Sequence, residues 1–397
     1  MAQAAPIQVV FEFFTKQVIL MYITVMQPPM YRQMSLDDFL FGDDNVSSVI
    51  SSNQTNTRTY VIKHMKPQYM TLIIFDRAKA RLAKFVEDTK ELREADRASL
   101  YDTFHIPKKS GGLRRIDAPK PELMSALRNL KEIFETDFNA LYHTSAFAYV
   151  KGRCTIDAVK RHQQNKSRWF AKLDLHDFFG STTLDFVMNQ LSEIFPFNLF
   201  CSDAALKEQL KMALELAFLN GKLPQGTPLS PLITNVMMIP IDLALSSGLR
   251  DFNGQRFVYT RYADDFLISS KYDFKIREVE QFVVDTLKSF SAPFSINAKK
   301  TRYGSSSGSN WNLGVMLNKD NEITIGHRKK REFSAMLHNY IMDRRNGIAW
   351  DKHDIQVMQG YYNYYSMIEP KAINDMIDQM NVKLGVNILR AIKDDLS

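Results

Sequence analysis

The distribution of apolar and polar positions predicts a chain in which helices and short strands are mixed. Apolar residues recur at helical spacing in residues 77–100 and 123–138. In the second segment they share one helix face, formed by Leu127, Leu130, Ile133 and Phe134. Residues 169–175 instead alternate, with Ala171, Leu173 and Leu175 on one side, which favours a strand. The pattern therefore predicts the α+β class.

Turn signals divide other parts of the chain. Two β-prone runs, 257–262 and 266–269, are separated by Ala-Asp-Asp, so we expect a tight hairpin with Asp264 and Asp265 at or beside its tip. The segment HIPKKSGGLRRIDAPKPEL, with its Pro and Gly-Gly punctuation, predicts two short strands joined by a turn. The small polar residues 47–58 indicate a linker after an N-terminal extension.

The N-terminal segment 7–26 is apolar, but Glu12 and Lys16 interrupt it and no basic region precedes it. We therefore expect an additional strand or helix, or a start codon assigned too early, rather than a signal peptide. No later segment has 18 uninterrupted apolar residues, so no membrane partner is expected. With only two cysteines, Cys154 and Cys201, a disulfide framework is not expected and a reducing, cytoplasmic location is the default.

Charge is concentrated in two parts of the 397-residue chain, whose formal net charge is +7. Residues 108–172 hold 14 Lys/Arg and 6 Asp/Glu, and residues 299–331 hold 8 and 2. The rest of the chain is net acidic. Basic segments are commonly solvated surface, but two of them on either side of acidic motifs suit a groove for nucleic acid around a metal site.

Three acidic positions are the candidates for chemistry. Asp174 lies near the end of one predicted strand, and Asp264 and Asp265 lie in the predicted hairpin. An Asp-Asp pair is also common in ordinary turns. Neighbouring residues of a strand point to opposite faces, so these two aspartates should have different roles.

The order of these motifs distinguishes the chain. Asp174, five residues before Phe179, is followed by Gln225-Gly226 with Ser230-Pro231, and then by Tyr262-Ala-Asp-Asp. In this order and spacing the sequence resembles the reverse transcriptase family of template-directed polymerases. The resemblance implies a right-hand polymerase fold with an N-terminal extension (residues 1–90), fingers (91–172), a palm with an antiparallel sheet, a late-fingers insert and a primer-side hairpin (173–326), and a helical thumb (327–397).

The resemblance also implies a two-metal mechanism with Mg²⁺, or alternatively Mn²⁺. Asp174 and Asp264 would hold both ions, Asp265 would support the primer-side ion, and the backbone carbonyl of Leu175 would add a ligand. Lys300 corresponds to the lysine that donates a proton to the departing pyrophosphate.

The remaining site residues follow from the same resemblance. Arg114, with Arg115 as the alternative, would bind the triphosphate through its guanidinium. Gln225 and Gly226 would approach the base pair and the template. The ring of Phe179 would exclude a 2′-hydroxyl and so favour dNTPs over NTPs. An ordinary core phenylalanine is the competing interpretation of Phe179.

The subfamily is less sharply defined. Only some 35 residues follow Gly360-Tyr361-Tyr362, so a maturase or endonuclease domain of the group II intron type is not expected within this sequence. Two retron markers are replaced, by Asp157-Ala158 with His162 one place late and by Leu313-Gly314. The chain is thus expected to be a stand-alone bacterial-type enzyme that resembles retron, group II intron-like and defence-associated or unclassified reverse transcriptases.

Several alternatives remain open at this point. The expected partners are an RNA template from a dedicated small RNA, the DNA product and dNTPs, and self-association into a homo-oligomer is an open alternative. The same site would also serve template-independent or protein-primed synthesis, with one of the tyrosines near Gly360 as the primer. A non-catalytic nucleic-acid-binding protein that keeps the palm is a further alternative.

Overall fold

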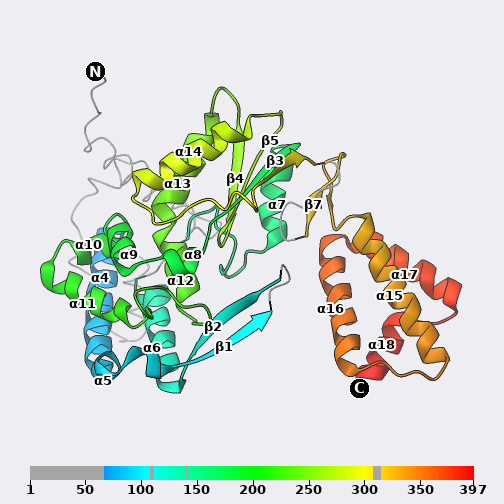
Figure 1. Cartoon of the computed structure of the whole chain (residues 1–397), viewed down its shortest axis with the longest axis horizontal. Coiled ribbons are helices and arrows are strands. Elements are labelled where there is room, and N and C mark those ends of the chain that lie inside the picture. The colour runs from blue at the N-terminus through cyan, green and yellow to red at the C-terminus, as the bar shows by residue number, and fades with distance from the viewer. Residues whose placement is uncertain (1–66, 108–110, 139–141, 307–313) are drawn as a thin grey trace, which may run out of the picture. The chain divides into compact units, whose positions relative to one another are not determined.

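The computed structural model describes residues 67–107, 111–138, 142–306 and 314–397 (Figure 1). All described residues belong to one compact unit, residues 66–397. The expected N-terminal element at 7–26 and the linker at 47–58 lie outside the described residues, as do Lys108 and Lys109.

A four-stranded antiparallel sheet with strand order β4-β5-β3-β6 lies at the centre of the unit. Its strands are β3 (Trp169–Asp174), β4 (Phe257–Tyr262), β5 (Asp265–Ser270) and β6 (Arg302–Ser305). The predicted strand at 169–175 and the predicted hairpin are confirmed. Tyr262 pairs with Asp265, so Ala263 and Asp264 form a two-residue turn, and Ala263 takes a positive φ of 56°.

Helices cover this sheet and complete its core. Helix α12 (Ser230–Met237) leads directly into α13 (Ile239–Gly248), which packs against β4 and against α14 (Ile276–Ser289). Strand β5 is buried on both faces: Phe266 and Ile268 are fully buried, and Leu267 between them is 5% exposed. The short helix η3 (Leu249–Asp251) follows α13 and adjoins the start of β4.

The segment HIPKKSGGLRRIDAPKPEL was predicted to form two strands joined by a turn. It belongs to the hairpin of β1 (Tyr101–Pro107) and β2 (Leu113–Pro119), as predicted. It is followed by α6 (Pro121–Glu132) and η2 (Ile133–Asp137), whose apolar face is buried as the spacing predicts. Helix α4 (Pro67–Asp88) packs on η2 and on α11 (Ala204–Glu215), and the short α5 (Lys90–Glu94) and η1 (Arg97–Leu100) lead to the hairpin.

A cluster of phenylalanines joins these helices. The rings of Phe138 and Phe197 stack with centroids 4.6 Å apart, and Phe134 and Phe200 pack around them at 4.8–5.2 Å. The cluster connects η2 with α10 (Phe197–Cys201), and neighbouring elements are α8 (Phe178–Ser181) and α9 (Leu184–Leu191). Helix α4 precedes the expected boundary between the N-terminal extension and the fingers at residues 90/91, yet its buried side chains belong to the same hydrophobic core as this cluster. The domain boundaries themselves stay predictions.

The C-terminal part is helical. It consists of α15 (His327–Arg345), α16 (Lys352–Ile368), α17 (Pro370–Leu384) and α18 (Ile388–Leu396), which share a second hydrophobic cluster. Helix α7 (Thr155–Gln164) and the small hairpin of β7 (Met316–Leu317) and β8 (Ile323–Thr324) border this cluster. Glu369 accepts a hydrogen bond from Thr324 and pairs with Lys330 at 2.6 Å, which connects the hairpin to α15 and α17.

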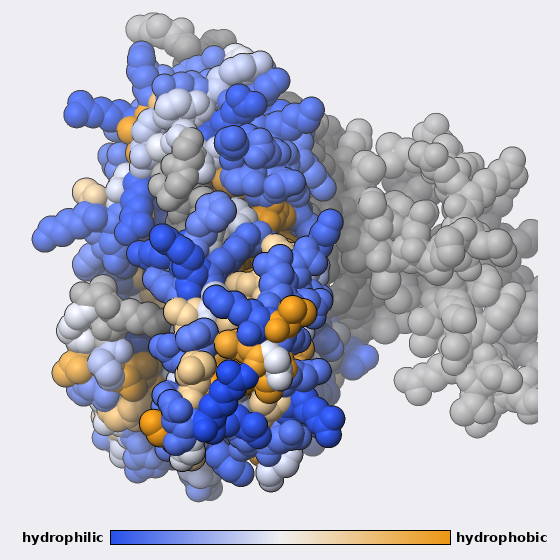
Figure 2. Space-filling view, turned by 90° about the vertical axis from the view of Figure 1, so that its right-hand side faces the viewer, coloured by the Kyte–Doolittle hydropathy of each residue, from blue (hydrophilic) through white to orange (hydrophobic). Residues whose placement is uncertain are grey.

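The surface seen in Figure 2, on the side of the helices α15–α18, is mostly hydrophilic, and its apolar residues form small groups. Within the described residues, no single helix is long and apolar enough to cross a membrane. One bent pair, α12 with residues 239–251, meets the length and composition criteria at an angle of 43°. Both cysteines are free.

Candidate active site

The three candidate aspartates meet at one end of the central sheet. Asp174 is the last residue of β3 and pairs across the ladder with Asp265, the first residue of β5. Asp264 lies in the turn before Asp265, and the backbone N–H of Leu175 donates to its carbonyl oxygen at 3.0 Å. Four positions that were singled out from sequence motifs 90 residues apart are therefore neighbours.

Two lysines balance the charge of these aspartates. Lys300 Nζ lies 3.0 Å from the Asp174 carboxylate, and Lys172 Nζ lies 2.7 Å from that of Asp265. Asn297 also binds Asp174, with its backbone N–H on the Asp174 carbonyl at 2.8 Å and its side-chain amide on the carboxylate at 3.3 Å. Lys172 was not identified as a site residue from the sequence, because its strand position alone does not show which side chain faces it.

The acidities of these groups reflect their surroundings. Burial raises the pKa of Asp264 above its usual range, and the charge of Asp265 raises it further. Burial likewise raises the pKa of Asp265, although Lys172 opposes this shift. The hydrogen bond to Asp174 raises the pKa of Lys300, so this lysine is protonated at neutral pH. The site thus brings carboxylates together in a buried position, where their charged forms are disfavoured.

The donor set fits a hard divalent cation. Carboxylate and carbonyl oxygens are the ligands that Mg²⁺ prefers, and one or two carboxylates suffice when substrate phosphates and waters complete the shell. The repulsion that raises the pKa of Asp264 would be relieved by a bound cation. Within the described ranges, no group of three or more His, Cys, Asp or Glu side chains is arranged as a ready metal site.

The Gln225-Gly226 segment packs against β2. The backbone N–H of Asp117 donates to the Gln225 carbonyl at 2.9 Å. Gly226 has a φ of +115°, and a Cβ at this position would lie 2.9 Å from Ile116 Cγ2 and 3.0 Å from the Asp117 carbonyl oxygen. Glycine is required here because the two backbones approach too closely for a side chain. The segment thus fixes β2 relative to the helix α12 that follows it.

The two candidate arginines of β2 differ in their contacts. Arg115 Nε lies 2.8 Å from Asp117 Oδ1, which holds its side chain against its own strand. Arg114 is exposed and close enough to interact electrostatically with Tyr149. Tyr149 interacts in turn with Asp264, and it is 56% exposed with a positive φ of 59°. Of the two arginines, Arg114 is thus the one that interacts with Tyr149, whereas Arg115 is held by Asp117.

Tyr149 was not predicted as a site residue. A tyrosine in the left-handed region is uncommon, and such backbone strain is often found at functional positions. The only sequence signal is its place in the fingers-like segment AYVKGRC, which does not reveal its conformation.

Phe179 lies on α8, which begins four residues after Asp174. Its ring is half-buried, 5.7 Å from the ring of the buried Phe178 in an edge-to-face arrangement. Part of the ring is therefore available to a ligand, whereas Phe178 is a core residue. The role of Phe179 in sugar selection stays a prediction.

A buried ion pair contacts the turn that carries Asp264. The guanidinium of Arg261 pairs with Asp242 of α13 at 2.7 Å, and both side chains are fully buried. Arg261 also donates to Asn235 of α12 at 3.1 Å and to the carbonyl of Ala263 at 3.3 Å. This pair joins two helices to the turn that carries Asp264, a connection that no sequence motif indicated.

The site geometry agrees with the comparisons to known proteins. Residues 106–333 match the reverse transcriptase (RNA-dependent DNA polymerase) family. The chain is 27% identical over 315 residues to the retron Ec83 reverse transcriptase of Escherichia coli, covering 79% of this chain and 96% of that protein. It is 29% identical over 277 residues to the retron Ec73 reverse transcriptase of the same species, covering 67% and 83%.

The family match covers more than half of the chain, which therefore belongs to the reverse transcriptase family and is an RNA-directed DNA polymerase. Its elements have the right-hand polymerase arrangement that the resemblance implied, and the family generally uses divalent metal ions. The replaced retron markers do not separate the chain from these relatives, since both are retron enzymes.

A solved structure of telomerase from Candida albicans with a fragment of telomeric RNA is also similar. The TM-score is 0.41 at 13% identity, and the match covers 75% of this chain and 59% of that one. The chain thus spans about three fifths of the telomerase chain.

Proposed function

We propose that the chain copies RNA into DNA by two-metal nucleotidyl transfer at the end of the palm sheet where Asp174, Asp264 and Asp265 meet. The observation that supports this most strongly is the pairing of Asp174 with Asp265 beside the turn that holds Asp264. These carboxylates, with the carbonyl of Leu175, would hold two Mg²⁺ ions, and Mn²⁺ would substitute for them. The ions would supply charge neutralisation and activation of the attacking hydroxyl.

The other residues act on the nucleotide in this proposal. Arg114 binds triphosphate oxygens, since its guanidinium is exposed and interacts with Tyr149, which interacts in turn with Asp264. Arg115 and the Gln225-Gly226 segment shape the surface beneath the template base pair through the contact with β2. Phe179 excludes a ribose 2′-hydroxyl.

Lys300 donates a proton to the departing pyrophosphate. Its raised pKa keeps it protonated at neutral pH, and its exposed amine lies within hydrogen-bond distance of Asp174. If Asp174 held a metal ion, the amine of Lys300 would be left free to donate its proton to the pyrophosphate.

The template in this proposal is a dedicated small RNA, and the DNA product serves bacterial antiviral defence. The relatives are retron reverse transcriptases, which supports a bacterial setting and a specific RNA partner. The proposed role in defence can be tested separately from DNA synthesis. Plating efficiencies of phages are compared on cells that carry the wild-type gene and on cells that carry its Asp264→Ala variant.

The direct test is primer extension by the purified chain on poly(rA)·oligo(dT) with Mg²⁺ and TTP. Asp264→Ala should reduce extension by at least about 10³-fold, because a metal ligand that neutralises transition-state charge is lost. Asp378→Ala, which removes an exposed carboxylate on α17, is the matched control and should extend normally. Extension by the Asp264→Ala protein at the wild-type rate would refute the proposal.

The same assay distinguishes the alternatives. A product whose sequence follows a mixed-sequence RNA template supports templated synthesis, and a homopolymer made without template indicates a terminal transferase. DNA covalently attached to the purified protein would indicate priming by a tyrosine. Absence of any product would favour a binding protein without activity.

A further inference from the structure

The central sheet has an acidic end and a basic end. At the catalytic end β3 finishes at Asp174, β4 at Tyr262, and β5 begins at Asp265. At the opposite end β3 and β4 begin and β5 finishes, and the residues just outside these strands are cationic: Lys166, Arg168, Arg256 and Lys271. Six residues of β4 at about 3.3 Å each separate the two ends by about 20 Å. The proposed chemistry uses only the acidic end.

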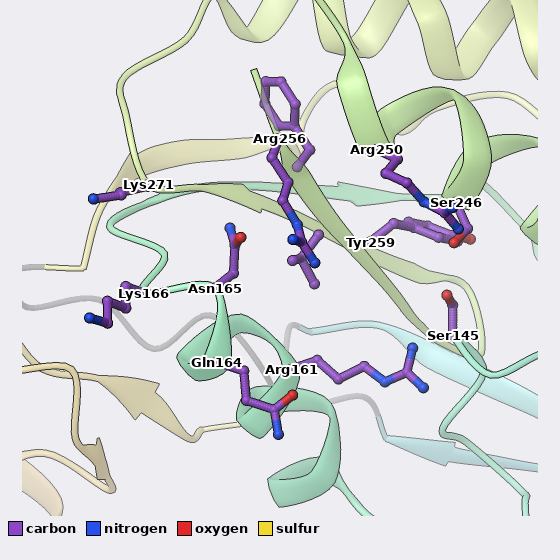
Figure 3. Close-up of a pocket in the computed structure, with 12 residues that line it drawn as sticks. Ser145, Arg161, Gln164, Asn165, Lys166, Ser246, Arg250, Arg256, Tyr259 and Lys271 are labelled. Carbon is purple, nitrogen blue, oxygen red and sulfur yellow. The ribbon is translucent and has the colours of Figure 1, made fainter. Parts of the chain in front are cut away.

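A cavity of about 520 Å³ opens at the basic end (Figure 3). The residues that line it come from α7 and the loop after it, the end of α13 with η3, the start of β4, and the residue after β5. Five of them are cationic and none is acidic; the cations are Arg161, Lys166, Arg250, Arg256 and Lys271. Its volume falls in the range of ligand-binding cavities.

The rim cations are available to a ligand. Lys166, Arg250, Arg256 and Lys271 are exposed, and within the described ranges none of them forms an ion pair. Asp242, which contacts the cavity-lining Tyr259, is already bound by Tyr259 and Arg261. The positive charge around the cavity is therefore not compensated by the residues that line it.

A second observation points to a missing partner at the inner wall. Ser145 is 1% exposed and lines the cavity, and its Oγ has no hydrogen-bond partner within the described part of the chain. Figure 3 labels Ser145 and Arg161 among the residues that line the cavity. A buried hydroxyl without a partner costs free energy, so an acceptor from outside the chain would satisfy it.

We propose that this cavity binds the phosphodiester backbone of RNA outside the template–primer duplex, with Ser145 and Arg161 at the inner wall and the other four cations at the rim. The inference rests on the proposed function, because RNA is the partner proposed there. It assigns a site for RNA at the end of the sheet opposite the catalytic aspartates.

The lining favours a nucleic-acid backbone over a free nucleotide. The aromatic residues of the cavity, Phe257 and Tyr259, are 6% and 4% exposed, so neither offers a ring face on which a base could stack. The cations are spread over four segments of chain rather than converging on one triphosphate. Neutral donors and acceptors, Gln164, Asn165 and Ser246, stand between them and suit phosphate oxygens and 2′-hydroxyls.

The experiment uses the full chain loaded with a dideoxy-terminated poly(rA)·oligo(dT) duplex and TTP, so that the catalytic cleft is occupied. A fluorescent hairpin RNA with a 12-base-pair stem is then titrated at several salt concentrations. The wild type should bind one hairpin per loaded complex. Arg250→Gln/Arg256→Gln should reduce the slope of log K against log salt by about 1–2, since each lost phosphate contact changes it by about 0.9, and should weaken binding at least about tenfold.

Ser145→Ala gives an independent readout. It should weaken hairpin binding by about fivefold without changing the salt slope, because a neutral hydrogen bond and not a charge is removed. Lys84→Gln/Lys207→Gln, which removes two exposed cations on α4 and α11, is the charge-matched control and should bind as the wild type does. Primer extension on the unterminated duplex should stay unchanged in all three variants, which also shows that they fold.

Several outcomes would overturn the inference. The first is that the loaded, active wild type does not bind the hairpin. The second is that Arg250→Gln/Arg256→Gln and the wild type have equal slopes of log K against log salt. The third is that Ser145→Ala binds the hairpin with the affinity of the wild type. Displacement of the hairpin by micromolar ATP or inorganic triphosphate would show a nucleotide site instead and would also refute it. Failure of the wild type to extend the primer at all would instead refute the proposed function.

Discussion

At the scale of single residues, the aspartates of the turn tie activity to pH. Their raised pKa values mean that Asp264 and Asp265 take up protons at a higher pH than ordinary aspartates, and a protonated carboxyl is a poor metal ligand. Mg²⁺ affinity should therefore fall as pH decreases. We expect primer extension at limiting Mg²⁺ to decline as the pH falls from neutral into the acidic range, and excess Mg²⁺ to restore it, because the ion competes with protons.

The matched variant for this prediction is Lys172→Gln. Lys172 lowers the pKa of Asp265, so its loss should raise that pKa and move the decline to higher pH. Rates would be measured from pH 5 to pH 8 at two Mg²⁺ concentrations. Superimposable pH profiles at low and high Mg²⁺ would contradict this interpretation.

Phe179 provides a second prediction at the residue scale. Phe179→Ala should increase ribonucleotide incorporation relative to deoxyribonucleotide incorporation by about 10- to 100-fold, the range expected when a pocket loses a steric contact. Phe178→Leu is the control, since its ring is in the core: it should lower stability and leave sugar selectivity unchanged. Single-nucleotide incorporation of TTP and UTP measures both. Unaltered selectivity in Phe179→Ala would assign this ring to packing alone.

The sequence could locate the acidic residues, because their motifs carry fixed residue types at fixed spacing. It could not show the partners of these residues. Lys172 and Asp265 are 93 positions apart, and their contact depends on the register of β3 against β5. The same holds for Ser145 and Arg161, which are ordinary in the sequence and become notable only because the fold places them in one cavity without a compensating acid.

At the scale of elements, the contact between the Gln225-Gly226 segment and β2 controls where the fingers strand lies. Gly226→Ala should lower the free energy of unfolding by about 1–3 kcal/mol and reduce primer extension, because the added Cβ would clash with β2. Gly254→Ala is the control: its φ is +70°, but a Cβ there meets nothing within 4 Å, so only the backbone cost of about 1 kcal/mol applies. Equal losses of activity in both variants would show that the contact with β2 is unimportant.

The elements themselves were the most predictable part of the fold. The strands at 169–175 and 257–269 and the hairpin β1–β2 follow from alternation and from turn residues, which act locally. The predicted helix at 123–138 is confirmed, but its last turn, η2, is a π-helix, which the spacing of apolar residues did not indicate. The buried pair of Arg261 and Asp242 could not be predicted either, since it depends on how α13 packs on β4.

At the scale of the whole molecule, charge is separated rather than mixed. The acidic turn and the basic cavity occupy opposite ends of one sheet, and helix α15 adds exposed cations at Arg328 and Arg331. The net charge of +7 hides this separation, and the two basic segments of the sequence include only two of the five cations of the cavity, Arg161 and Lys166. What the segments could not show is which cations are neutralised in the fold: Lys330 of the same helix pairs with Glu369.

The difference between the exposed cations of α15 and the paired Lys330 can be tested by substitution. Arg328→Ala/Arg331→Ala should weaken binding of a poly(rA)·oligo(dT) duplex and reduce its salt slope by about 1–2, because exposed cations release counterions from phosphates. Lys330→Ala removes the cation next to Arg331. The ion pair of Lys330 with Glu369 is largely buried, whereas that of Arg328 with Glu332 is exposed, so Lys330→Ala should lower stability through the loss of the contact with Glu369 and leave the slope unchanged. Binding would be measured by fluorescence anisotropy at salt concentrations from 50 to 300 mM, with thermal unfolding as the stability readout. If both variants changed the slope equally, formal charge and not exposure would decide which cations of the thumb bind the duplex.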